Sequence, residues 1–182
     1  MNKYLKRTLT YCTIALIVIY GIQLLVDYSF NKRSTDKFNK IFNHETDDEI
    51  MVFGSSVANV HFDAQLASAR TGMTSINEGL HGTFLGQYSG LIYEYLSYET
   101  KCKYLIICCG FDNLGNNPLI TRPDLFLSHI SNQYEYKSLL GIEHDKIWRA
   151  KYLPGYKLTL EDKQFYKELF LPSEKPDTLL GF

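Results

Sequence analysis

The chain has 182 residues, enough for one domain and an appendage. Hydrophobic residues make up 45% of it and charged residues 21%, a composition that excludes an intrinsically disordered protein. Lysine and arginine number 19 against 20 aspartates and glutamates, so the net charge is -1. No basic field exists to attract nucleic acid, and we expect no nucleic-acid partner.

The N-terminal segment is predicted to anchor the protein in a membrane. No charge interrupts residues 8–26, TLTYCTIALIVIYGIQLLV, and such a run at helical rise matches the roughly 30 Å hydrocarbon core of a bilayer. Lys3, Lys6 and Arg7 precede it, so the positive-inside rule places residues 1–7 in the cytoplasm. After a single pass over residues 8–27, the remainder is expected on the extracytoplasmic side of the cell membrane.

Two other interpretations of this segment are open. A cleaved signal peptide has a shorter apolar core and small residues at its cleavage site, whereas bulky residues end this run. A buried globular helix is rarely free of charge for so long. Residues 28–47, which follow, are polar with Phe38, Ile41 and Phe42 at helical spacing, and predict a juxtamembrane spacer.

Residues 48–182 are predicted to form an α/β domain. Short apolar runs at 49–53, 74–77 and 103–110 indicate strands, and the last, a continuous run, is expected to be buried on both faces. Helical spacing marks 62–72 and 83–99 between them. This alternation predicts a parallel sheet with right-handed crossovers.

Polar and glycine-rich clusters follow each of the three predicted strands. They read Gly54-Ser55-Ser56, then residues 77–82 (NEGLHG), then residues 110–113 (GFDN). Ligands of parallel sheets bind beyond the carboxyl ends of the strands, so these clusters are expected at one edge. A Gly-Ser-Ser turn between strand and helix presents a nucleophile well, but it also has the features of an ordinary helix N-cap.

These three blocks resemble those of the SGNH (GDSL-like) hydrolase superfamily, over about residues 49–117. The resemblance implies a flavodoxin-like three-layer α/β/α sandwich behind one transmembrane helix. It makes Ser56 the nucleophile, with Ser55 in the place of the family's aspartate, and Gly79 an oxyanion-hole donor. The third block of the family reads Gly-x-Asn-Asp, whereas here Asp112 precedes Asn113, so the polar pair is reversed. Asn113 is the expected second oxyanion group.

The last block of the family, Asp-x-x-His, is absent from this sequence. We therefore expect residues 48–182 to be an incomplete domain, the first part of a longer or truncated protein. His81, at the expected edge, is the alternative base, although a local hydrogen bond in its loop explains it as well. A serine hydroxyl is a poor nucleophile until such a base takes its proton.

The expected function is ester chemistry at the cell envelope. The resemblance to membrane-anchored members implies a serine esterase or O-acyltransferase that forms an acyl-serine on a polysaccharide or glycan ester, with a membrane acyl-transfer partner. A catalytically silent, membrane-anchored binding or assembly subunit is the alternative. Phosphate or nucleotide binding at the Gly54 turn is weaker, because no phosphate-binding glycine motif occurs.

The rest of the chain gives fewer signals. Residues 123–136 predict a helix start and a helix. Four residues, Trp148, Arg149, Tyr152 and Tyr156, suit either a carbohydrate platform or a cover for the sheet. The four cysteines and five histidines show no metal-type spacing, so we expect no metal and no cofactor.

Overall fold

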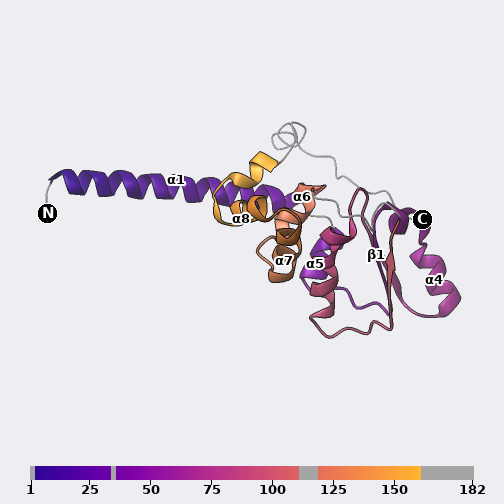
Figure 1. Ribbon diagram of the computed structural model, residues 1–182. Helices are drawn as coiled ribbons and strands as arrows, with labels where there is room; N and C mark the ends of the chain where they lie inside the picture. The colour runs from indigo at the N-terminus through magenta and orange to yellow at the C-terminus, as the bar shows by residue number, and fades with distance from the viewer. Residues whose placement is uncertain (1–2, 34–35, 111–118, 161–182) are drawn as a thin grey trace.

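The computed structural model describes residues 3–33, 36–110 and 119–160 of the chain. A long helix, α1 (Lys3–Arg33), leads into a small α/β unit (Figure 1). Its elements in chain order are α2 (Asp36–Phe42), β1 (Ile50–Gly54), α3 (Ser56–His61), α4 (Ala64–Thr71), β2 (Ser75–Gly79), α5 (Leu85–Leu96), β3 (Tyr104–Cys108), α6 (Pro123–Phe126), the 3₁₀ turn η2 (Leu127–His129), α7 (Gln133–Ile142), α8 (His144–Tyr152) and the 3₁₀ turn η3 (Tyr156–Leu160).

The three strands form a parallel sheet in the order β2-β1-β3, as the alternation of strand and helix patterns predicts. All five residues of the central strand β1 are buried. Met51 and Phe53 face the α5 side and join the main core, whereas Ile50 and Val52 pack with Ala58 of α3 on the other side. Helices therefore lie on both faces of the sheet, with α5 on one and α4 on the other (Figure 1).

The strand β3 corrects one prediction. Its continuous apolar run predicts burial on both faces, yet Tyr104, Ile106 and Ile107 are 56%, 38% and 43% exposed. The reason is that β3 is the edge strand: it pairs with β1, and no described residue pairs with its other side. Apolar character alone does not distinguish a central strand from an edge strand.

The helix predicted over residues 62–72 is shorter and more exposed than expected. His61 ends α3, and Asp63 then caps α4 by accepting a hydrogen bond from the Leu66 backbone N–H at 2.8 Å. Gly72 ends α4 in the left-handed conformation, with φ 73°. No residue of α4 is buried, because the helix packs against the edge strand β2 and projects beyond it.

The region around residues 123–136 is divided rather than one helix. After α6 and η2, the side chain of Asn132 accepts hydrogen bonds from the backbone N–H groups of Tyr134 and Glu135, at 2.8 and 3.1 Å, and starts α7. Asn132 is therefore the N-cap of α7: its side chain takes the place of the backbone carbonyls that would accept these N–H groups in a continuous helix, so a new helix begins here. The α7 helix then packs along α5.

The segment expected as a spacer, residues 28–47, contributes directly to the core. Phe30 at the end of α1 and Phe38 and Ile41 of α2 are at most 1% exposed. Phe38 packs edge-on against Phe126, with ring centroids 5.1 Å apart. The chain that leaves α1 is thus part of the folded unit.

Most of α1 itself is exposed and apolar. It is long and apolar enough to cross a membrane, and almost none of its most apolar stretch is buried. A helix that served as the core of a soluble protein would be mostly buried, so the structure disfavours that alternative. Among the described residues, the domain meets the C-terminal part of α1, from Ile22 onward, where Val26 and Phe30 are buried.

Candidate functional site

The carboxyl ends of β1 and β2 meet, as the sequence blocks predict. Gly54 lies opposite Gly79 of β2 and opposite Cys108 of β3 in the sheet register. The Leu80 backbone N–H donates to the Gly54 carbonyl at 2.9 Å, which continues the pairing into the loop after β2. Two of the three predicted clusters therefore share one edge. The third begins at Gly110, and its candidates Asp112 and Asn113 lie outside the described residues.

Gly54 is required by its surroundings as well as by its conformation. Its φ is 157°, and a Cβ there would collide with the Cys108 carbonyl and the Ala58 side chain. Gly79, at the end of β2, also has no room for a side chain, because a Cβ there would collide with the Asn59 backbone nitrogen. These two glycines allow α3 to pack tightly against the ends of both strands.

The two serines of the turn have different surroundings. Ser55 is 2% exposed and is the N-cap of α3, where its Oγ accepts a long, weak hydrogen bond from the Val57 backbone N–H at 3.5 Å. Ser56, the first residue of α3, is exposed. The structure thus assigns the capping role to Ser55 and leaves the Ser56 side chain at the surface.

His81 lies beside the helix that begins with Ser56. Its Nε2 is 2.7 Å from the Nδ2 of Asn59, and Asn59 follows Ser56 by three positions, on the same side of α3. The amide nitrogen of Asn59 is a hydrogen-bond donor, so the Nε2 of His81 is the acceptor in this contact. His81 is itself exposed.

The predicted oxyanion donor of the second block already has a partner. The Gly79 backbone N–H donates to the Oδ1 of Asn77 at 2.9 Å. The Nδ2 of Asn77 in turn donates to the carbonyls of Ala58 and Phe62, both at 2.8 Å, so this amide ties β2 to α3. In the described arrangement Gly79 is therefore a structural donor.

A lysine from α2 contacts the same loop. The Nζ of Lys37, on α2, donates to the Gly79 carbonyl at 3.0 Å and to Asn59 Oδ1 at 3.1 Å. Asn59 thus lies between Lys37 and His81. The sequence does not predict a role for Lys37 or Asn59 at this site. The two hydrogen bonds of Lys37 join residues 22 and 42 positions apart, and no local motif indicates them.

Glu78 is the most perturbed carboxyl group at this edge. It is 2% exposed, and its Oε2 has no hydrogen-bond partner among the described residues. Burial raises its pKa to about 7, although the positive charges of Lys37 and Lys40 oppose the rise. The side chain points to the core side of the sheet, opposite to its neighbour Asn77, because adjacent strand residues alternate.

The remaining histidines are engaged elsewhere or lie at the surface. His44 is 2.9 Å from Glu94 and stacks on Tyr98, while His144 is 3.2 Å from Asp145. His129 stacks on Phe42 at 4.1 Å, and its burial lowers its pKa to about 4. His61 is exposed at the end of α3.

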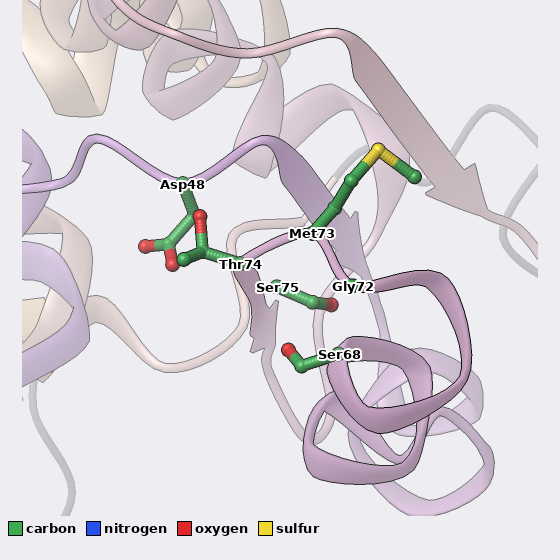
Figure 2. A pocket seen from close by; sticks show the side chains of 6 residues that line it. All are labelled: Asp48, Ser68, Gly72, Met73, Thr74 and Ser75. Carbon is green, nitrogen blue, oxygen red and sulfur yellow. The ribbon is translucent and has the colours of Figure 1, made fainter.

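A shallow pocket of about 370 Å³ opens at the other edge of the sheet (Figure 2). It is lined by residues that precede β1, end α4 and begin β2: Asp48, Ser68, Gly72, Met73, Thr74 and Ser75. Parallel sheets bind ligands at their carboxyl edge, so this pocket is not at the expected position. Across the parts of the chain that the structure describes, no group of three or more His, Cys, Asp or Glu residues is arranged to hold a metal.

The aromatic residues of the C-terminal part do not cover the sheet. Trp148 and Tyr152 lie on α8 and Tyr156 on η3, and α8 packs against α7 and η3. Figure 1 shows α8 on the side of α7 that faces away from the strands. Of the two interpretations of these residues, burial against the sheet is therefore wrong.

No family model matches this chain, and no curated protein or solved structure matches it either. The function is therefore inferred from the residues of this chain.

Proposed function

We propose that this protein is a membrane-anchored serine esterase or O-acyltransferase of the SGNH type, with Ser56 as its nucleophile. The observation that supports this proposal best is the exposed Ser56 at the carboxyl edge of a parallel sheet, immediately after the Gly54 turn. The strand order β2-β1-β3 with helices on both faces supports a flavodoxin-like three-layer fold.

The chemistry assigns each group a definite task. A base takes the Ser56 proton, the Ser56 oxygen attacks the ester carbonyl, and an acyl-serine forms as the alcohol leaves. Water or a sugar hydroxyl then accepts the acyl group. The proposed substrates are the ester-linked acyl groups of envelope glycans. The protein would add or remove these acyl groups together with a membrane acyl-transfer partner. Lys3, Lys6 and Arg7 before the apolar run support a cytoplasmic N-terminus and an extracytoplasmic domain.

Two hydrogen bonds must change for this site to work with His81 as its base. His81 then has to exchange Asn59 for the Ser56 hydroxyl, and the Gly79 N–H has to leave Asn77 before it can stabilise an oxyanion. Losing one oxyanion donor typically lowers the rate about 10²–10³-fold, so these rearrangements matter for activity.

The same two hydrogen bonds favour a second candidate function. A site whose histidine and oxyanion donor are both held by asparagines suits a catalytically silent binding or assembly subunit. In that case the Gly54 turn and Asn77 serve only to hold α3 against the sheet.

Labelling with a fluorophosphonate probe separates the two functions. The full-length protein in its native membranes is treated with the probe, beside Ser56→Ala and Ser55→Ala variants. The enzyme proposal expects labelling that Ser56→Ala abolishes and Ser55→Ala retains, since Ser55 is buried as the helix cap. Absence of labelling in all three folded proteins favours the binding subunit.

A further inference from the structure

The C-terminal part of the domain is fastened to α1 by specific polar contacts. The Gly155 backbone N–H donates to Gln23 Oε1 at 2.8 Å, and the Lys157 Nζ bonds Asp27 Oδ1 at 2.6 Å. The Lys157 side chain is only 7% exposed, so this ion pair is partly shielded from water. Gly155 also lies against the side chain of Ile22. These contacts fix α8 and η3 at one level along the helix.

That level coincides with the end of a membrane span. From Thr8 to Asp27, the span predicted from the sequence, α1 rises by roughly 30 Å, which equals the thickness of the hydrocarbon core. Asp27, the partner of Lys157, is the first charged residue after this apolar run. Residues 3–20 are all exposed, and the contacts with Gly155 and Lys157 involve Ile22, Gln23 and Asp27, in the last two turns of this span. Figure 1 shows α8 and η3 nearer the N-terminal end of α1 than α5 and the strands are.

At this level α8 has a surface suited to lipid. We name Trp148, Tyr152 and Leu153 the α8 surface; they are 46%, 54% and 44% exposed. The rings of Trp148 and Tyr152 lie 5.5 Å apart, while Ile147 and Ala150 on the opposite side of α8 are buried in the core. Tryptophan and tyrosine are enriched at membrane–water interfaces because their rings are apolar with one polar group.

Basic residues accompany these side chains. Arg149 and Lys151 lie on α8 next to Trp148 and Tyr152 in the sequence, and Lys151 Nζ is 3.8 Å from the centre of the Tyr136 ring. A short helix with aromatic residues on one side and lysine or arginine beside them is typical of segments that lie in the headgroup region.

We propose that the α8 surface rests in the lipid headgroup region of the membrane that α1 crosses. The partner is the bilayer itself, because the polar contacts of Gly155 and Lys157 hold α8 near the end of the span at which α1 leaves the hydrocarbon. Helices and sheet stack along the direction of α1 in Figure 1, so this contact turns the α4 side of the sheet away from the membrane. The inference is independent of the proposed ester chemistry.

The chain provides its own probe, because Trp148 is its single tryptophan. The full-length protein is reconstituted into phosphatidylcholine vesicles whose acyl chains are brominated close to the ester carbonyls. The expected result is at least a two-fold loss of Trp148 fluorescence relative to unbrominated vesicles, with protection from aqueous iodide.

Matched variants identify the surface responsible. Replacing Tyr152 and Leu153 by aspartate is expected to restore most of the lost fluorescence and to admit iodide. The control replaces Tyr93 and Leu96 of α5, which are 60% and 59% exposed, by aspartate and should leave the quenching unchanged.

Three results would overturn the proposal. The first is full iodide access with no bromine quenching in the wild-type protein, as expected if Trp148 faces water or a glycan. The second is equal quenching in both variant pairs. The third is a wild-type protein that fails to float with the vesicles. Because the wild-type measurement decides by itself, misfolding of a variant does not leave the proposal untested.

Discussion

The buried carboxyl group of Glu78 leads to a quantitative prediction about stability and pH. Burial raises its pKa from 4.5 to about 7, so the folded protein holds this proton longer than the unfolded chain does. Stability is therefore greatest below the unfolded pKa and is lost as the pH rises through 7. One pKa unit corresponds to about 1.4 kcal/mol. Above pH 7, where Glu78 is ionised in both the folded and the unfolded protein, its charge therefore lowers the free energy of unfolding by roughly 3 kcal/mol.

The Glu78→Gln variant removes this penalty. By linkage, the penalty is about 1 kcal/mol at pH 5 and about 3 kcal/mol at pH 8. The unfolding free energy of the variant minus that of the wild type should therefore rise by about 2 kcal/mol over this range. The difference isolates Glu78, since Glu135, whose pKa burial also raises, and His129, whose pKa burial lowers to about 4, are present in both proteins.

Urea unfolding in detergent micelles, followed by Trp148 fluorescence, measures this difference. Glu99→Gln is the matched control, because Glu99 is an exposed glutamate on the loop after α5. A Glu78→Gln difference that stays constant between pH 5 and pH 8, to within about 0.5 kcal/mol, would refute the assignment of a buried, proton-holding carboxyl group.

Two further predictions concern packing and positioning. Gly90→Ala should destabilise the protein by about 1–3 kcal/mol in urea unfolding, because a Cβ there would overlap Glu135, whereas Gly86→Ala in the same helix should be neutral or stabilising by up to about 1 kcal/mol; equal effects would contradict this account of the α5–α7 contact. Lys37→Met should reduce stability by about 1–3 kcal/mol through its lost hydrogen bonds, and Lys40→Met by no more than about 0.5 kcal/mol. If labelling of Ser56 is observed, Lys37→Met should also lower its rate, and an unchanged rate would show that Lys37 does not position the loop.

Local patterns in the sequence predict the alternation of strands and helices, the parallel sheet and the apolar α1. They also predict that the turn at Gly54 and the loop at Gly79 meet, because both follow parallel strands and such ends share an edge. These features depend on the periodicity of apolar residues and on the direction of the strands, and both can be read from residues that are close together in the sequence.

Other properties depend on contacts between distant residues, and only the tertiary structure decides them. Ser55 and Ser56 are chemically identical neighbours, yet packing buries one as a helix cap and exposes the other. Lys37, Asn59 and His81 meet across three separate segments. The position of β3 at the sheet edge depends on which strand pairs with which, and the position of η3 beside α1 depends on the contact between Lys157 and Asp27, which are 130 residues apart. No local pattern contains that information, because burial and pairing are properties of the whole packed chain.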